Sequence, residues 1–373
     1  MALRKKGPKI VISGYYGFDN CGDEAILLAM IHCLTKLRPD ARIVVLSDKP
    51  EKTGAIYGVK AVNRWKPAAV AAELLTCSLL ISGGGSLIQD VTSLKSPKYY
   101  LAIILGAGLI GKKVILYGQG IGPLSDTGNR ARTARILKRC HEITVRDRRS
   151  AELLKELGVE QDVKVTCDPV MALSYEDIDR EEVREELQEM NILDSAGRKR
   201  KPLLLVAIRN WKENKHLTPV AELLDAQARM GWDVLLVPAH FPADMEAVKE
   251  IGNRMSERLY CLGQNLTARQ FLALTAYADR VFSMRLHGLI AAMAMGAPML
   301  ALSYDPKVDA FMEQAGLERY CLSYDDFDWE TAVYLLEEME ASPLESRQEQ
   351  EARRLVMQEQ AWETARMAVA LLE

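Results

Sequence analysis

Short apolar runs alternate with amphipathic segments along the first part of the chain. Strand-like runs occupy residues 9–13, 42–47, 78–82, 113–117, 142–145 and 163–166. Helical patterns such as 23–37 and 151–157 lie between most of these runs. Apolar strands separated by helices are typical of a parallel sheet that is buried on both faces. The pattern predicts a doubly wound α/β domain over residues 1–173.

The same alternation restarts after a charged segment. Residues 174–201 contain almost no strand signal, and we interpret them as a linker with one exposed helix. Strand-like runs return at 202–208, 233–238, 258–261, 279–283 and 298–302, which predicts a second domain over residues 202–344. The expected fold class is α/β, with two doubly wound parallel-sheet (Rossmann-like) domains that face a cleft. A helix at 345–373 is expected to pack back across both lobes.

Length and charge agree with two globular domains and argue against nucleic acid as a partner. The chain has 373 residues, 49% of them hydrophobic, and a net charge of −3. The obvious basic run is RKRK at 198–201. This run is either a solvated part of the linker or a contact with anionic lipid headgroups on the inner face of a membrane.

The sequence gives little sign of export, membrane insertion or metal binding. The apolar run 10–12 is too short for the core of a signal peptide, and no run approaches the roughly 20 apolar residues that span a bilayer. The 7 cysteines are scattered and form no CxxC pair, and HExxH is absent. We expect a cytoplasmic protein, at most peripheral to a membrane, with reduced thiols and no metal site. No pattern indicates an oligomeric state.

The segment 279–298, DRVFSMRLHGLIAAMAMGAP, carries the clearest candidate chemistry. A strand at 279–283 is followed by an apolar helical run at 286–295, so Arg285 and His287 fall on the turn between them. Helix N-termini favour anions, and a cation there opposes the helix dipole. We therefore expect a phosphate or carboxylate at this turn. The alternative is that Arg285 pairs with an acidic neighbour and His287 caps the turn.

Glycine-rich loops follow three strands of the first domain. Glycines let backbone N–H groups approach a ligand closely, although each loop alone is also explained as a tight turn. GxGxxG and the Walker motif are both absent, so neither nucleotide fingerprint applies. The candidate binding residues here are Asn20, Gly84, Gly85, Ser86, Gln119 and Gly120, and Asp23 is a further candidate beside Asn20.

Basic residues follow further strands. Arg146 and Arg148 crowd the start of a helix that Asp147 can cap, and a bound anion would relieve their repulsion. The alternative for each arginine is a surface ion pair. In the second domain the candidates are Arg209, His240 and Lys307, against the alternatives of a loop cap for His240 and a solvated side chain for Lys307.

These motifs have a joint order that is more specific than any one of them. They are GYYGFDNCGDEAIL, ISGGGSLIQD, YGQGIGPL, TVRDRRSAELL and SMRLHGLIAAMAMGAP. Together they resemble the polysaccharide pyruvyl transferase family, most closely its CsaB-type cell-wall polymer members. The resemblance implies a glycosyltransferase-B-like fold and transfer of a pyruvyl group from phosphoenolpyruvate to a sugar, without a cofactor. In the CsaB-type members the sugar is a terminal N-acetylmannosamine of a lipid-linked precursor, and the ketal product serves S-layer anchoring.

The resemblance also implies roles for the candidate residues. Phosphoenolpyruvate carries a carboxylate and a phosphate, which arginine forks bind bidentately. Ketal formation needs protonation of the methylene carbon, and histidine, with a pKa of about 6.5, is suited to that step. His287 is therefore the candidate general acid. The phosphate would be held by Arg285 and Lys307, the carboxylate by Arg146 or Arg148, and Asp23 is the candidate base.

Two other functions remain open at this point. A nucleotide-sugar glycosyltransferase of the same fold would hold a diphosphate at a similar turn. Such enzymes usually place a glutamate against the ribose, and the helix after His287 contains no acidic residue before Asp305. The other alternative is a protein that only binds a sugar or nucleotide.

Overall fold

The computed structural model describes residues 7–91, 93–341 and 344–373, and contacts between residues divide the chain into two compact units. Unit 1 comprises Met1–Phe18, Asp23–Ala172 and Met357–Glu373, and unit 2 comprises Asp19–Gly22 and Leu173–Val356. Both units are therefore discontinuous in sequence. Residues 1–6, part of the segment considered above as a signal peptide, lie outside the described residues.

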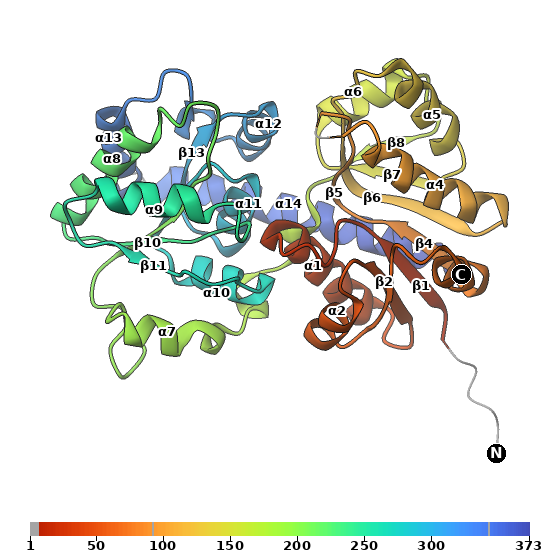
Figure 1. Ribbon diagram of the computed structural model, residues 1–373, viewed down its shortest axis with the longest axis horizontal. Helices are drawn as coiled ribbons and strands as arrows, with labels where there is room; N and C mark the ends of the chain where they lie inside the picture. The colour runs from red at the N-terminus through yellow and green to blue at the C-terminus, as the bar shows by residue number, and fades with distance from the viewer. Residues whose placement is uncertain (1–6, 92, 342–343) are drawn as a thin grey trace. The chain divides into compact units, whose positions relative to one another are not determined.

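Unit 1 is built on a parallel sheet whose strands follow the order β3-β2-β1-β4-β6-β7-β8, with β5 paired to β6. The strand order reverses between β1 and β4, and open α/β sheets bind ligands at the carboxyl ends of the strands beside such a reversal. Figure 1 shows the sheet with its helices. The strands are β1 Lys9–Ser13, β2 Arg42–Ser47, β3 Lys60–Asn63, β4 Leu79–Ser82, β5 Gly85–Ile88, β6 Lys113–Ile121, β7 Glu142–Val145 and β8 Val163–Val165.

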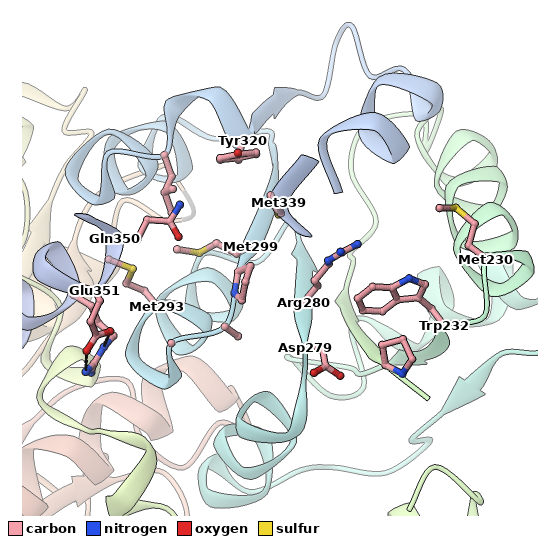
Figure 2. Close-up of a pocket in the computed structure, with 16 residues that line it drawn as sticks. Met230, Trp232, Asp279, Arg280, Met293, Met299, Tyr320, Met339, Gln350 and Glu351 are labelled. Atoms are coloured by element: carbon pink, nitrogen blue, oxygen red, sulfur yellow. Dashed lines mark hydrogen bonds and ion pairs between the residues drawn. The ribbon is translucent and has the colours of Figure 1, made fainter. Parts of the chain in front are cut away.

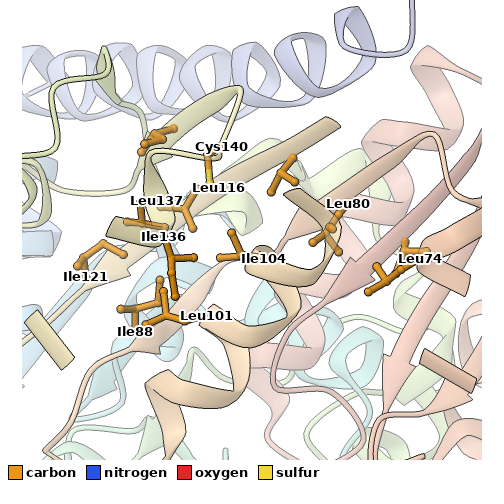
Figure 3. Close-up of a cluster of buried hydrophobic side chains, with 14 of the residues drawn as sticks. Leu74, Leu80, Ile88, Leu101, Ile104, Leu116, Ile121, Ile136, Leu137 and Cys140 are labelled. Atoms are coloured by element: carbon orange, nitrogen blue, oxygen red, sulfur yellow. The ribbon is translucent and has the colours of Figure 1, made fainter. Parts of the chain in front are cut away.

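Helices cover this sheet because their apolar residues need a partner surface. Figure 3 shows Leu101 and Ile104 of α4 packed with Leu80, Leu116 and other buried apolar residues. This burial provides most of the driving force for folding the unit. The helices are α1 Cys21–Leu37, α2 Pro50–Tyr57, α3 Pro67–Thr76, α4 Ser96–Leu109, α5 Thr127–Leu137 and α6 Arg148–Glu156.

Unit 2 repeats the same plan with a parallel sheet of order β11-β10-β9-β12-β13-β14. Its reversal point lies between β9 and β12. The strands are β9 Leu203–Ala207, β10 Asp233–Leu236, β11 Tyr260–Cys261, β12 Arg280–Ser283, β13 Met299–Ser303 and β14 Cys321–Ser323. The helices that follow them are α8 Leu217–Arg229, α9 Met245–Arg254, α10 Ala268–Tyr277, α11 Leu286–Met295, α12 Pro306–Ala315 and α13 Trp329–Ala341.

The predicted fold class is confirmed, and the differences concern element bounds. Strands β3 and β14 were not predicted. Strand β6 continues through Gln119 and Gly120, and β5 includes Gly85 and Ser86, so these four residues lie in strands and the expectation that they form loops is wrong. The helix expected from residue 151 begins at Arg148, because Asp147 accepts a hydrogen bond from the amide of Ser150 and caps it.

The charged segment between the sheets contains short helices with buried apolar residues. The α-helix in it is α7 Arg184–Glu189, and Leu187 is fully buried. In the RKRK run, Arg198 pairs with Asp194 at 3.0 Å, and the Lys199 ammonium lies 2.6 Å from Asp279. Two of its four basic side chains are thus engaged within unit 2. Contact of this run with lipid stays a prediction.

The C-terminal helix α14, Leu344–Ala370, contributes residues to both units. Its unit 1 portion is fixed by specific bonds: the Cys167 thiol donates to the carbonyl of Met357 at 2.8 Å, and the Trp362 indole donates to the carbonyl of Ala172 at 3.1 Å. The Thr364 hydroxyl lies 3.0 Å from that of Thr166. Residues 357–373 are therefore an integral part of unit 1. Across the described ranges, the helices are all too short or too polar to span a membrane.

Candidate functional site

The turn between β12 and α11 is held by short-range hydrogen bonds at the reversal point of unit 2. Arg285 is the N-cap of α11, and its carbonyl accepts hydrogen bonds from the hydroxyl of Ser283 at 2.8 Å and the amide of Gly288 at 2.9 Å. A Cβ at Gly288 would lie 2.4 Å from the Ser283 Oγ, so a larger residue there would displace the Ser283 hydroxyl. The helix behind this turn is buried from Gly288 to Met295. Arg285 and His287 are thus presented on a rigid support.

The guanidinium of Arg285 is bound by Asp244. Asp244 is 1% exposed, and its carboxylate accepts hydrogen bonds from Nε of Arg285 at 3.1 Å and from Nη2. The same carboxylate accepts a bond from the amide of His240 at 2.9 Å. The acidic-neighbour alternative for Arg285 therefore holds in this structure. A guanidinium has five N–H donors, and among the described residues only Nε and Nη2 of Arg285 donate to side chains, so Nη1 remains for an additional anion.

A short segment near the N-terminus completes this cluster. Asn20 forms an isolated antiparallel bridge with His240, and the amide of Cys21 donates to the carbonyl of Ala239 at 3.1 Å. A Cβ at Gly22 would lie 2.1 Å from Nδ1 of His287, so the backbone of Gly22 packs directly on the imidazole. Four predicted residues, namely Asn20, His240, Arg285 and His287, are thus brought together within unit 2.

The charges of two arginines of the site affect the pKa of His240. Burial lowers the pKa of its imidazole, and the charges of Arg285 and Arg209 lower it further, while Asp244 and Asp19 raise it. The net direction is downward, which favours the neutral ring at pH 7. A neutral His240 can accept or donate a hydrogen bond to a ligand without adding a further charge.

Replacing His240 with glutamine is expected to weaken the dependence of stability on acid pH. Because the native pKa lies below the unfolded value of about 6.5, the unfolded state binds more protons as the pH falls below that value, and the folded state loses stability until the pH passes the native pKa. Above the unfolded pKa the effect vanishes. Urea unfolding of both proteins at about pH 5 and about pH 8 measures it. If the wild type and His240→Gln lost the same free energy of unfolding between about pH 8 and about pH 5, the expectation would be wrong. The pKa of His216, which burial also lowers, contributes equally to both.

Arg209 and Lys307 lie on the same edge of the unit 2 sheet. Arg209 follows β9, donates to the Tyr304 hydroxyl at 2.9 Å and lies over the rings of Trp211 and Tyr304 at 5.3 Å and 5.0 Å. Lys307 is in the first turn of α12, where its amide donates to Asp305 at 3.0 Å. β9, β12 and β13 are adjacent strands, so Arg209, Arg285 and Lys307 all follow neighbouring carboxyl ends.

Unit 1 contains a separate group of predicted residues around Arg146. Arg146 is 6% exposed, and it donates to Asp168 at 2.8 Å and to the Ser86 hydroxyl at 2.9 Å. Gln119 is fully buried beside Gly83 and Ser82, and its Oε1 has no hydrogen-bond partner among the residues that the structure describes. Arg148 is exposed in the first turn of α6. The two arginines thus have different environments.

Alanine at Arg146 is expected to destabilise the protein, and alanine at Arg148 is not. Breaking a buried ion pair leaves Asp168 charged and desolvated, which costs about 3–5 kcal/mol in the free energy of unfolding. An exposed arginine contributes within about 0.5 kcal/mol. Urea unfolding of both variants measures the difference. A similar small loss in both would show that the Arg146–Asp168 pair adds little to stability.

The triple glycine is explained largely by packing. A Cβ at Gly83 would lie 2.3 Å from the hydroxyl of Tyr16, and one at Gly84 would lie 2.9 Å from Ile26. Gly85 has φ +86°, and Asp23 Oδ1 lies 2.8 Å from where its Cβ would be. Asp23 is 9% exposed in the first turn of α1. Asp23 is therefore a neighbour of Gly85 at the start of β5.

Sequence reasoning missed the carboxylates that hold the two arginines. Asp168 follows β8 closely and Asp244 precedes α9, positions where a helix cap or a turn residue is the ordinary explanation. The signal that the sequence offered for these two aspartates is their position just after a strand or just before a helix. Neither residue lies near its arginine in the sequence, so pairing was not visible there.

A cavity of about 600 Å³ lies at the opposite edge of the unit 2 sheet. Its lining includes Trp232 and Asp279, each just before a strand, and residues of α14, and Figure 2 shows Arg280 beside Trp232. The Arg280 guanidinium lies 4.1 Å from the Trp232 ring centroid. The lining contains none of the predicted site residues within the described part of the chain.

Solved structures with the same architecture include sugar-nucleotide enzymes. A UDP-GlcNAc 2-epimerase from Neisseria meningitidis, bound to UDP-GlcNAc, has a TM-score of 0.62 at 12% identity over 98% of this chain and 99% of that chain. A glycosyltransferase from Rickettsia africae has a TM-score of 0.63 at 10% identity over 98% and 99%. A UDP-GlcNAc 2-epimerase from Methanocaldococcus jannaschii has a TM-score of 0.62 at 13% identity over 88% and 91%. The fold is thus of the glycosyltransferase-B-like class.

Sequence comparison identifies the family within that class. The profile of the family described as polysaccharide pyruvyl transferase matches residues 20–306. This span includes Asn20, Arg146, Arg285 and His287. The chain belongs to the polysaccharide pyruvyl transferase family. No curated protein matches the sequence.

Proposed function

We propose that this protein transfers the pyruvyl group of phosphoenolpyruvate to a sugar and releases phosphate. The observation that carries the proposal is the cluster of Asn20, His240, Arg285 and His287 at the reversal point of the unit 2 sheet, inside the span that matches the family. Arg209 and Lys307 add cations at the same sheet edge. A small donor with two acidic groups is the ligand class that such an arrangement favours.

The chemistry follows from the charges of the donor. His287 donates a proton to the methylene carbon, and a sugar hydroxyl attacks the central carbon and loses its proton to a base. The bond from that carbon to the phosphate oxygen then breaks, and a second hydroxyl closes the ketal ring as its proton is released. Arg285 and Lys307 stabilise the charge on the departing phosphate. Arg146 or Arg148 is proposed for the carboxylate, and Asp23 for the base.

For the acceptor we propose a terminal N-acetylmannosamine of a lipid-linked cell-wall precursor, as in the CsaB-type members that the motifs resemble. This would place the enzyme in the cytoplasm, where phosphoenolpyruvate is made, in peripheral contact with the inner membrane face. The product would be a secondary cell wall polymer ketal used in S-layer anchoring. The exposure of Arg200 and Lys201 supports a lipid contact, because both basic side chains are on the surface.

Phosphate release on mixing the full chain with phosphoenolpyruvate and a panel of glycosides tests the proposal. We expect release with an N-acetylmannosamine glycoside that exceeds release with galactose and glucose glycosides. Thermal shift with phosphoenolpyruvate against UDP-sugars separates it from a nucleotide-sugar glycosyltransferase. Stabilisation by UDP-sugars alone, without phosphate release, would reject the proposal, and binding without turnover would favour the protein that only binds.

A further inference from the structure

Aromatic side chains from the loops after β1 and β3 and from the start of α4 gather around one buried arginine at the carboxyl ends of the unit 1 strands. Arg64 follows β3 and is 4% exposed. The centre of its guanidinium lies 4.4 Å from the Tyr99 ring, 5.1 Å from Trp65 and 5.2 Å from Phe18. Tyr15 stacks on Phe18 with centroids 4.1 Å apart. We call Tyr15, Phe18, Trp65 and Tyr99 the aromatic platform.

The buried guanidinium of Arg64 holds the loops that carry the aromatic platform in place. Nη1 of Arg64 donates to the carbonyl of Gly14 at 2.6 Å, which ties the loop after β1 to the loop after β3. Its Nε has no hydrogen-bond partner among the described residues, so the ring faces provide much of the charge stabilisation. The Tyr99 hydroxyl donates to the carbonyl of Arg64 at 3.3 Å. The rings are therefore held in place, with Tyr15, Phe18 and Tyr99 half-buried and Trp65 exposed.

Trp65 is the exposed member of the platform. Its side chain is 58% exposed, although tryptophan is usually among the more buried residues. The indole N–H donates to Asp48 at 2.6 Å, and the amide of Trp65 donates to Asn63 at 2.8 Å. An exposed ring that is fixed at its edge loses little conformational freedom when a ligand packs on its face. This is the arrangement of a preformed contact surface.

The surroundings of the platform indicate the class of ligand. Asp48 places a carboxylate at the rim, where it can accept hydrogen bonds from hydroxyl groups. The charge of Asp23 raises the pKa of Tyr15, after the larger effect of burial, so the candidate base lies within electrostatic range. Two carboxylates disfavour a phosphate-bearing nucleotide. A pyranose ring instead offers apolar C–H faces for the rings and hydroxyl groups for Asp48.

We propose that the aromatic platform binds a sugar ring of the acceptor glycan, with Trp65 as the stacking surface and Asp48 as the hydroxyl acceptor. The inference rests on the proposed function, because it names where the acceptor of that reaction is held. It assigns Trp65 to substrate binding, apart from any role in the chemical step.

Steady-state kinetics of Trp65→Ala tests this role. We expect KM for the glycoside to rise about tenfold, which corresponds to about 1.4 kcal/mol, because the sugar loses the aromatic face on which it packs. KM for phosphoenolpyruvate should not change. The matched control is Tyr334→Ala, which removes an aromatic ring that is 59% exposed in unit 2. An unchanged glycoside KM in Trp65→Ala, with phosphate release intact, would overturn the inference and leave the proposed function standing.

A binding measurement decides the question independently of turnover. Saturation-transfer NMR of the full chain with methyl N-acetyl-β-mannosaminide, and separately with UMP, measures which ligand contacts the platform. We expect the glycoside signal to be lost in Trp65→Ala and retained in Trp65→Phe, which keeps a ring face and guards against a folding defect. Asp48→Asn should weaken the signal. Loss of UMP binding instead would mark a nucleobase site, and equal glycoside signals in all variants would also overturn the inference.

Discussion

Replacing His287 with alanine is expected to lower kcat for phosphate release by about 10²–10⁴-fold, the usual contribution of a general acid. The proton transferred to the methylene carbon would have to come from water. Binding of phosphoenolpyruvate should change much less, because the arginines remain. Stopped-time assays of phosphate release at saturating donor measure the loss. Thermal unfolding of the variant checks that the contact with Gly22 is not needed for folding.

The matched control is His141→Ala, which removes an exposed histidine in unit 1. We expect wild-type turnover from it. His287→Gln adds a second control, since glutamine fills similar space and donates hydrogen bonds but cannot supply an acidic proton. Near wild-type turnover in His287→Ala, or full activity in His287→Gln, would remove this residue from the role of acid.

Replacing Arg285 with alanine is expected to lower kcat/KM for phosphoenolpyruvate by about 10²–10³-fold, the range for loss of one charged group that stabilises a developing anion. It also leaves Asp244 buried without its cation, at a cost of about 3 kcal/mol in the free energy of unfolding. Initial rates at low donor concentration measure the first effect, and urea unfolding measures the second.

A second substitution, at Asp244, separates the loss of kcat/KM from the loss of stability. In Arg285→Ala/Asp244→Ala the unpaired carboxylate is gone, so stability should recover in part while kcat/KM stays low. Arg285→Lys keeps the charge but loses the bidentate fork, and an intermediate rate is expected. An unchanged rate for Arg285→Ala at low donor concentration would exclude Arg285 from the donor site.

Hydrophobic periodicity was sufficient to predict the fold class. Runs such as Lys9–Ser13 and Met299–Ser303 are apolar because both faces of a central parallel strand are covered by helices. The strand β5 and the end of β6 escaped prediction because glycine is unfavourable in strands and usually indicates a turn. Here Gly85 and Gly120 accommodate close neighbours, Asp23 and Arg146, whose approach depends on tertiary structure.

The sequence predicts those parts of the candidate site whose residues are close together along the chain. Arg285 and His287 share one turn, so their proximity follows from the strand and helix on either side. The pairing of Arg285 with Asp244 depends on how β10 and β12 are placed in the sheet. The membership of Asn20 in unit 2 depends on backbone bonds to residues far along the chain. Neither the Arg285–Asp244 pair nor the backbone bonds of Asn20 produce a pattern in the hydrophobic periodicity or composition of the sequence.

Because the helix residues from Met357 onward complete unit 1, this lobe cannot be obtained by cutting the gene after its first sheet. During synthesis the ribosome finishes all of unit 2 before it releases the last piece of unit 1. The surface around Cys167 and Thr166 therefore stays uncovered until residues 357–373 have been synthesised. A circular permutation that places residues 357–373 ahead of β1 would remove that delay.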